Sequence, residues 1–435
     1  MSIIKRWTRF DDFSKVVKSA KAAKYCCLIC IVIFIAVTLV CSCKKNSQTS
    51  ASSFKTYTLN YYPTPLTNSP DVKFLRLASG NFIGVLNGGN NDSNFYFYKF
   101  DSRGNFISST HHNFYQKTCY TISAIGNDFF ITGTTNITPV GYFAAKFDTN
   151  INMLWDTSYK YTNTISGMAA CASTDGNILI SVAVTTVNSQ MYLIKLEAAH
   201  GGLLLKEEIK TSGKFICQPS NMQERNNSVY ITGIYYYFPS GSTSSLFGSY
   251  FCVNASENGF VKWFKNEPVP DSTAKSPTIA GFIIADDTTG PIATIGITCP
   301  STVNFGYIIG AMKAYSFDPV SGNALDSATF GIDSNVELCF IRATQDGGYI
   351  IAGTGNYYKN APTEPTTILL IKTDAHFNVQ WQKKINPGGS FYIDYGVFVL
   401  SDGYEITGRN STIVNTVTKE DLFFMKTDLQ GNMTD

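Results

Sequence analysis

The feature that most constrains this chain of 435 residues is an internal repeat with a period of about 50 residues. Four segments align directly, namely NDFFITGTT, NSVYITGIY, GGYIIAGTG and DGYEITGRN. Each begins with a turn, continues with strand-favouring residues and reaches a glycine. The aligned column is occupied by Gly133, Gly233, Gly353 and Gly408, and in three weaker copies by Leu86, Val182 and Gly296. The chain therefore contains seven related units.

A second column follows the first in every unit and carries Lys-x-Asp, or a variant of it, before a tight turn. Its lysines are Lys99, Lys146, Lys195, Lys372 and Lys426. Units of roughly 40 to 50 residues with several strands are typical of the four-stranded blades of a β-propeller. In each unit, strand A would precede an Asp-Gly type turn, and strand B would end at the glycine column. Strand C would carry the lysine, and strand D the tryptophans Trp155, Trp263 and Trp381.

Composition agrees with an all-β protein. Tyr (25), Phe (31) and Gly (34) are abundant, which favours strands and tight turns over helices. In the segment from Phe95 to Phe100 both alternating faces are apolar, as expected for a sheet packed between two neighbours. Charged residues are only 15% and the formal net charge is +2, with no long basic stretch beyond the first 45 residues. This balance gives no basis for nucleic-acid binding.

The two ends of the repeat predict how the ring closes. The chain ends at DLQGNMTD, after the C strand and turn of the seventh unit, so that unit lacks a D strand. The segment FKTYTLNYY, from Phe54 to Tyr62, precedes the first unit and has no partner of its own. We predict that it completes the seventh blade, in an arrangement that resembles the Velcro closure of known propellers. The expected fold is a seven-bladed β-propeller over residues 54–435, closed by an N-terminal strand.

The N-terminus predicts a membrane address. Residues 1–24 carry seven Lys and Arg, and Tyr25 to Cys43 carry no charge. The apolar segment ends in LVCSCKK, which resembles the lipobox of bacterial lipoproteins with Cys43 as the acylated residue, and SCKK with a polar tether is similar to Bacteroidetes lipoproteins. We expect residues 1–43 to be a helical lipoprotein signal peptide or, alternatively, a retained membrane anchor. Residues 44–53 would be a flexible tether.

The repeat as a whole resembles the propeller modules of exported Bacteroidetes proteins, in the form DGGYIIAGTG followed by ILLIKTDAHFNVQWQKK. The resemblance covers roughly residues 54–435 and implies a binding scaffold without identifying its ligand. Together with the N-terminus, it predicts a protein of the bacterial cell envelope that is membrane-anchored and faces the periplasm or the cell surface.

The search for catalytic chemistry predicts none. The chain has four histidines without spacing suited to zinc, and it lacks the nucleophile-elbow, P-loop and dinucleotide motifs. Because Lys-x-Asp recurs at one structural position, we expect an architectural pair, with Lys pairing along the sheet and Asp starting the turn. No catalytic residue, metal ligand or cofactor is therefore predicted. The segment FDPVSGNALD resembles the repeats of quinone-dependent dehydrogenases, which keeps an enzyme as the less favoured alternative.

Eleven cysteines raise the question of disulfides. Five lie in the N-terminal segment, and the other six are spread over the blades as Cys119, Cys171, Cys217, Cys252, Cys299 and Cys339. An exported protein could pair them. Their distribution instead favours small buried hydrophobic residues.

The predicted binding site lies where the loops are long. Short A–B and C–D turns would occupy one face of the ring, and the opposite face would carry irregular loops at residues 235–249, 356–367 and 410–421. Rigid scaffolds present binding residues on such loops. Aromatic side chains with polar tips suit sugar rings or a protein partner. The candidates are Tyr235, Tyr236, Tyr237, Phe238, Tyr357 and Tyr358.

The sequence thus predicts a non-catalytic, lipid-anchored envelope protein that binds a glycan or a protein partner at the loop face of a propeller. Two alternatives remain open. One is an outer-membrane assembly scaffold, by analogy with propeller lipoproteins that assist barrel assembly. The other is an enzyme that acts on a polysaccharide or uses a quinone.

Overall fold

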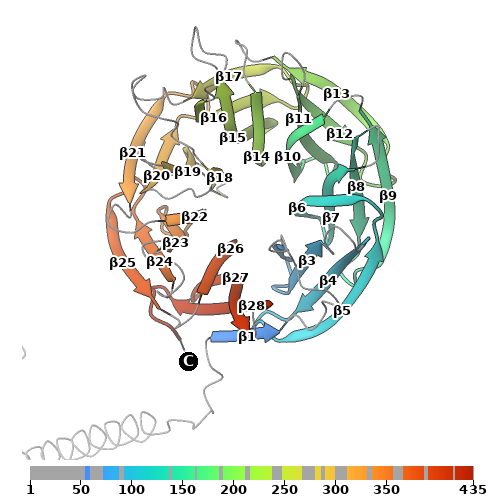
Figure 1. The fold of residues 1–435 in the computed structure, drawn as a ribbon. Helices are drawn as coiled ribbons and strands as arrows, with labels where there is room; N and C mark the ends of the chain where they lie inside the picture. The colour runs from blue at the N-terminus through green and yellow to red at the C-terminus, as the bar shows by residue number, and fades with distance from the viewer. Residues whose placement is uncertain are drawn as a thin grey trace, which may run out of the picture. The chain divides into compact units, whose positions relative to one another are not determined.

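The structure is a computed structural model. It describes residues 54–58, 72–87, 93–136, 140–161, 164–185, 190–210, 216–237, 247–266, 280–285, 290–298, 311–330, 336–355, 366–386, 390–414 and 417–434. These residues form 28 strands in seven four-stranded antiparallel sheets. The sheets follow one another around a ring within the unit Ser52–Thr434 (Figure 1). The predicted all-β, seven-bladed propeller is confirmed.

Each of the first four blades is continuous in the chain, with its strands in the order A, B, C, D from the channel to the rim. Blade one contains β2 (Val72–Arg76), β3 (Phe82–Asn87), β4 (Asn94–Phe100) and β5 (Phe106–Asn113). Blade two contains β6 (Lys117–Ile125), β7 (Asp128–Thr135), β8 (Gly141–Phe147) and β9 (Met153–Lys160). Blade three contains β10 (Thr164–Ala172), β11 (Ile178–Thr185), β12 (Gln190–Leu196) and β13 (Leu203–Ile209). Blade four contains β14 (Ile216–Arg225), β15 (Ser228–Tyr237), β16 (Phe247–Ser256) and β17 (Val261–Asn266).

The remaining blades include the one that closes the ring. Blade five contains β18 (Ala280–Ile284), β19 (Ile292–Thr298), β20 (Ala311–Phe317) and β21 (Ala324–Phe330). Blade six contains β22 (Val336–Ala343), β23 (Tyr349–Gly355), β24 (Thr367–Thr373) and β25 (Val379–Ile385). Blade seven contains β26 (Ser390–Val399), β27 (Gly403–Val414), β28 (Val417–Asp428) and, as its D strand, β1 (Phe54–Thr58).

The N-terminal strand β1 closes the ring as predicted. It pairs antiparallel with β28, with Phe54 opposite Met425 and Thr58 opposite Asp421. Without β1, β28 would present an unpaired row of backbone N–H and C=O groups at the rim, and such edges invite aggregation. Figure 1 shows β1 beside β28 at the junction between the last blade and the first.

The glycine column has a steric cause in blades two and four. The inner strand of each blade carries a register shift, between Cys119 and Thr121 in β6 and between Pro219 and Asn221 in β14. At these shifts the inner strand's carbonyl groups crowd strand B. A Cβ on Gly133 would lie 1.8 Å from the Thr118 carbonyl oxygen, so only glycine fits.

Hydrophobic cores lie between adjacent blades, which explains why strand C is apolar on both faces. In β4, Phe95 and Phe97 join the core shared with blade two. The alternate residues Tyr96, Tyr98 and Phe100 join the core shared with blade seven. That second core lies at the junction of first and last blades, where the ring of Phe424 is centred 4.7 Å from the ring of Phe100.

The D-strand tryptophans connect neighbouring blades. Trp263 of blade four packs over Gly322 in the C–D turn of blade five, and its Nε1 donates to the Pro319 carbonyl at 3.1 Å. Gly322 has a φ of +67°, and a Cβ there would lie 2.6 Å from the indole. Trp155 and Trp381 make the same contact with the next blade's turn glycine. The recurrent Trp and Gly columns of the sequence therefore belong to one inter-blade contact.

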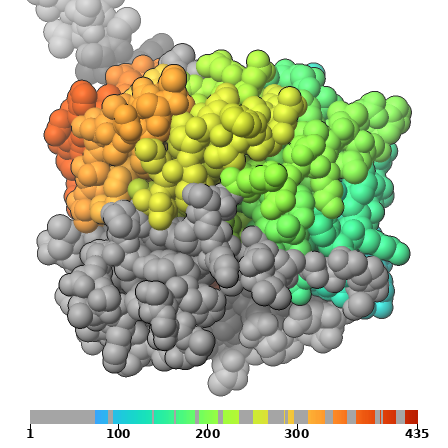
Figure 2. Space-filling view, turned by 90° about the horizontal axis from the view of Figure 1, so that it is seen from above, coloured from blue at the N-terminus to red at the C-terminus, as the bar shows by residue number. Residues whose placement is uncertain are grey.

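The described blades follow one another around the rim of the ring. Figure 2 shows the ring from its side, with blades three, four and five following one another in green, yellow and orange. Strands A and C of every blade run towards one side of the ring, which we call the turn face because it carries the A–B and C–D turns. The opposite side, with the B–C and D–A connections, is the loop face. Among the residues that the structure describes, no helix is long and apolar enough to cross a membrane.

Candidate functional site

The C–D turns are organised by a carboxylate. In blade two, Asp148 Oδ1 accepts the backbone N–H groups of Asn150 and Asn152 at 2.8 and 2.9 Å, and its Oδ2 accepts the Asn152 side-chain amide at 2.8 Å. Burial opposes ionisation of Asp148, but the hydrogen bonds from Asn152 and Asn150 outweigh it and lower its pKa. Asp101, Asp374 and Asp428 make the same contacts in their own blades.

The lysine column is also structural in four blades. Each of these lysines forms an ion pair with an Asp at the A–B turn of its own blade. The pairs are Lys146–Asp128 at 3.0 Å, Lys195–Asp175 at 2.6 Å, Lys372–Asp346 at 2.9 Å and Lys426–Asp402 at 2.7 Å. Lys99 differs, because it donates to the Thr149 carbonyl of blade two at 2.7 Å. The predicted architectural role of Lys-x-Asp is confirmed in these blades.

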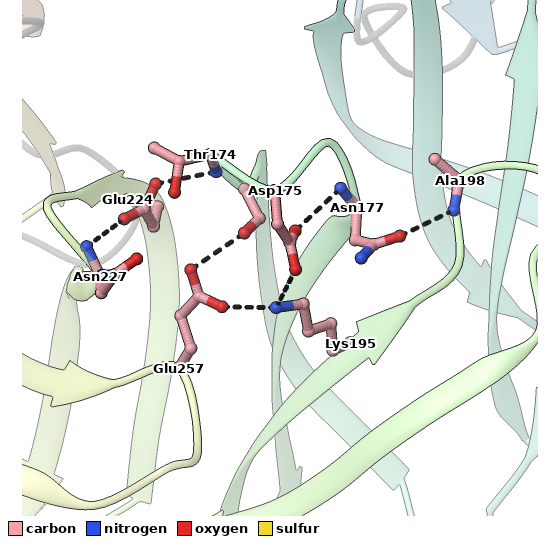
Figure 3. Close-up of polar contacts among 9 residues, drawn as sticks. Thr174, Asp175, Asn177, Lys195, Ala198, Glu224, Asn227 and Glu257 are labelled. Atoms are coloured by element: carbon pink, nitrogen blue, oxygen red, sulfur yellow. Dashed lines mark hydrogen bonds and ion pairs between the residues drawn. The ribbon is translucent and has the colours of Figure 1, made fainter.

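Blades three and four add a polar network that crosses between them (Figure 3). Lys195 contacts both Asp175 of its own blade and Glu257 in the C–D turn of blade four. Glu257 also accepts a hydrogen bond from Ser173 Oγ at 3.0 Å. Glu224 on β14 accepts the backbone N–H of Thr174, again from blade three, at 3.0 Å. The network therefore ties the turn-face ends of two blades together.

The pKa values show how firmly these carboxylates hold their charge. Burial opposes ionisation of Asp175, but hydrogen bonds from Lys195, Ser173 and Asn177 lower its pKa to about 2. Burial likewise opposes ionisation of Asp346, and hydrogen bonds from Thr344, Lys372 and the Gly348 amide lower its pKa to about 2. The pKa of Lys195 is raised because Asp175 and Glu257 together outweigh its burial. These groups remain charged at neutral pH.

Four of the predicted buried cysteines are described with their side chains. Cys119, Cys171, Cys217 and Cys252 are free and buried. Burial raises the pKa of Cys217 to about 12 and raises those of Cys171 and Cys252 as well. For these four, the prediction of small buried hydrophobic residues is confirmed. Within the described ranges, no group of three or more His, Cys, Asp or Glu side chains could hold a metal ion.

A cavity of about 720 Å³ occupies the channel near the turn face. It is lined by the last residues of six inner strands, at 74–78, 121–124, 170–172, 221–224, 342–343 and 398–399. Arg76 and Arg342 contribute guanidinium groups, whereas the Glu224 carboxylate already accepts two backbone N–H groups. The sequence did not indicate this cavity, because the lining residues come from six separate strands and meet only when the ring closes.

On the loop face, two blades depart from the others. The B and C strands of blade seven, β27 and β28, are each 12 residues long. Those of blade four, β15 and β16, are each 10 residues long, compared with 6 to 8 in the other blades. Pairing continues to Val414 opposite Val417 and to Tyr237 opposite Phe247. Both hairpins therefore extend past the ends of the described B and C strands of the neighbouring blades.

This finding corrects the prediction of an irregular loop at residues 410–421. Residues 410–414 and 417–421 are strands of a regular hairpin. The segment NSTIVNTVTKED is rich in Thr and Val, which favour extended pairing, and the Asn-Thr between the strands gives a two-residue connection.

Only some of the predicted site residues are among the residues that the structure describes. Tyr235, Tyr236 and Tyr237 belong to the extension of β15, where the backbone is described. Phe238, Tyr357 and Tyr358 lie outside the described residues, as does Cys43. Glu224 and Glu257, which the sequence reasoning missed, bring blades three and four together. The sequence offered little indication of these contacts, because Glu257 stands out only as an unusual turn residue in a divergent repeat.

Comparisons with known proteins agree on the fold. No protein-family model matches the chain, and no curated protein matches its sequence. It is similar to the solved structure of the polysaccharide lyase Uly1, with a TM-score of 0.52, 13% identity, and coverage of 85% of this chain and 91% of that one. It is also similar to a PL25 ulvan lyase, with a TM-score of 0.52, 9% identity, and coverage of 88% and 97%.

The extracellular region of plexin A4 is similar as well, with a TM-score of 0.53 and 6% identity. The match covers 83% of this chain but only 39% of the plexin chain. At such identities the likeness shows the propeller fold alone, which hosts both enzymes and binding proteins.

Proposed function

We propose that this protein is a non-catalytic, lipid-anchored propeller of the bacterial cell envelope that binds a glycan or an envelope protein at its loop face. The observation that supports the proposal is the pair of extended hairpins, β15–β16 and β27–β28. They rise from blades four and seven, which stand across the channel from one another (Figure 1). At about 3.3 Å per residue, the extra residues of β27 reach roughly 13 Å beyond a typical blade.

A closed ring is a suitable base for such projections. Its cores lie between blades, and the turn-face contacts join one blade to the next, so the hairpins stand on a scaffold that resists deformation. Binding residues on a rigid scaffold lose less conformational entropy when a ligand is bound. Three successive tyrosines, Tyr235 to Tyr237, belong to one of the hairpins. Tyrosine is a preferred contact residue for both sugars and proteins.

The anchor belongs to the same proposal. Three features of the sequence support it. They are the basic segment, the uncharged stretch that begins at Tyr25, and the lipobox-like LVCSCKK, which contains Cys43 and ends at Lys45. A Cys43→Ala variant is expected to lose its lipid when cells are labelled with an acyl-chain probe. Acyl labelling equal to that of the parent would contradict the anchor.

The binding site is tested with the detergent-solubilised full chain on an array of envelope glycans and in a pull-down from membranes. A variant with Tyr235→Ala, Tyr236→Ala and Tyr237→Ala is expected to bind at least about tenfold more weakly. The matched control is Tyr115→Ala, which removes an exposed tyrosine from the D–A connection between β5 and β6. Equal binding by the tyrosine variant and the control would refute the proposed site. Capture of an abundant barrel protein instead would favour the assembly scaffold.

A further inference from the structure

Exposed apolar side chains gather at one level of the ring. In the first three blades they are the opening pair of each D strand, namely Phe106 and Ile107, Met153 and Leu154, and Leu203 and Leu204. Leu154 and Leu204 are 50% and 55% exposed. Later positions of the same strands are mainly polar, as in Ser108 to Asn113 of β5. The apolar character is therefore confined to the end of the strand that follows the C–D turn.

The other blades repeat this placement. Phe260 directly precedes β17 and is 73% exposed, Leu325 is the second residue of β21, and Val379 is the first residue of β25. In blade seven, Leu429 and Met433 flank the C–D turn. Among the described residues, all large exposed hydrophobic side chains except Tyr115 and Tyr120 lie in C–D turns or at the starts of D strands. We call this set the apolar belt.

The topology places the belt at the edge of the turn face. Strand C of each blade ends on that face, and in the first six blades strand D starts directly after the C–D turn. The belt is therefore a circle of small apolar spots, each of one or two side chains, spaced around the ring. Single hydrophobic side chains scattered over a surface need no explanation. These side chains instead recur at one structural position in every blade and lie at one edge of the ring, so a surface that meets this edge contacts many of them together.

The chain's own N-terminal segment enters the ring at the same level. Phe54 is the first residue of β1, the D strand of blade seven, and lies opposite Met425, close to the C–D turn at Asp428. The position that Phe106 and Met153 occupy in their blades, opposite the residue just before the C–D turn, is held in blade seven by Met433, which bridges to Thr427, two residues beyond the partner of Phe54. Residues 44–53 can span at most about 35 Å when fully extended and roughly 17 Å on average. An anchor at Cys43 would therefore keep a lipid surface within reach of the belt.

We infer that the apolar belt docks the propeller on the surface of the lipid bilayer, with the loop face turned away from it. This inference rests on the proposed lipid anchor. A plane can touch many spots around a circle at once, whereas a globular partner or a second copy needs one contiguous patch. Side chains of this kind enter the interface to about 5 to 10 Å. Docking would hold the two hairpins out towards their ligand.

The test places a fluorophore at two exposed positions of the full chain in vesicles of phosphatidylethanolamine and phosphatidylglycerol that contain shallow doxyl-labelled lipid. Leu154→Cys carries the label in the belt. Tyr115→Cys carries the label on the loop face, in the D–A connection between β5 and β6. The parent chain is labelled in parallel, and the fluorescence from label on its own cysteines is subtracted. We expect the belt label to lose about half of its fluorescence, because it lies at interface depth. The loop-face label should lose almost none.

A second variant checks that the belt itself causes the approach. Phe106→Ser, Leu203→Ser and Leu204→Ser together, all at exposed positions, should reduce quenching at residue 154 while the chain still sediments with the vesicles. Equal quenching at both positions, or none at residue 154 in a vesicle-bound chain, overturns the docking and leaves the anchor intact. A chain that does not bind vesicles overturns both. Shielding of residue 154 that depends on protein concentration without vesicles would assign the belt to a second copy.

Discussion

The two faces of the ring obey different rules. On the turn face, most blades repeat the same two packing devices: a carboxylate inside the C–D turn and a lysine paired with the A–B turn. On the loop face, the described B and C strands are 6 to 8 residues long in five blades and are longer in blades four and seven. Repetition marks what every blade needs in order to pack. Departure from the repeat marks what the ring as a whole can do.

The largest expected effect comes from breaking the ring at its closure. A fragment that begins at residue 63 lacks β1 and leaves the edge of β28 unpaired. We expect it to aggregate, since the loss is comparable to the whole stability of a typical domain, about 5 to 10 kcal/mol. Size-exclusion chromatography checks this against a fragment that begins at residue 54. If the shorter fragment is monomeric and equally stable, closure by β1 is not what holds the ring.

The next effect concerns the inter-blade tryptophan contact. Gly322→Ala adds a Cβ 2.6 Å from the Trp263 indole at a φ of +67°, and we expect a loss of about 2 to 4 kcal/mol in the free energy of unfolding. Gly347→Ala is the matched control, because its φ is +81° and nothing lies within 4 Å of the added atom. The control should lose only about 1 kcal/mol. Urea denaturation measures the free energy of unfolding of both variants. Equal losses would show that the contact between Trp263 and Gly322 does not stabilise the ring.

A smaller effect is expected from the polar network between blades three and four. Lys195→Met leaves Asp175 and Glu257 without their shared cation, and we expect a loss of about 1 to 3 kcal/mol. Lys426→Met removes a more exposed lysine with a single partner, so it should cost less than about 1 kcal/mol. Thermal unfolding of both variants measures the difference. If the Lys426 variant loses as much stability as the Lys195 variant, the contact between Lys195 and Glu257 of the next blade does not stabilise the protein.

The smallest effect is the acid response of the turn face. Asp175 and Asp346 have pKa values of about 2, below their ordinary value of 3.8. A lowered carboxyl pKa contributes stability above about pH 4, and this contribution is lost as the pH falls towards 2. After discounting for solvent exposure, each group should contribute about 1 kcal/mol or less. Asp346→Asn should flatten this part of the stability curve, and an unchanged curve would refute the assignment.

Much of the turn face could be predicted from sequence, because a repeated device leaves a repeated column. The ring closure, the apolar faces of strand C and the Lys-x-Asp pairs all follow from periodicity and strand alternation. The hairpin at residues 410–421 was wrongly expected to be an irregular loop, because Asn and Thr serve both turns and strands. The contacts of Glu224 and Glu257, and the cavity beside Arg76, were not predictable, since they join residues that become neighbours only through the ring.

In this account the turn face holds the ring together, and the extended hairpins of the loop face bind the ligand. The most direct test is to shorten these hairpins. Replacing residues 411–420 and 235–249 by Asn-Gly turns would join Asn410 to Asp421 and Ile234 to Tyr250, which already face one another across their strands. On the glycan array and in the membrane pull-down, the shortened chain should lose all binding shown by the parent while its melting temperature changes little. Full retention of parental binding by a stably folded shortened chain would contradict the account.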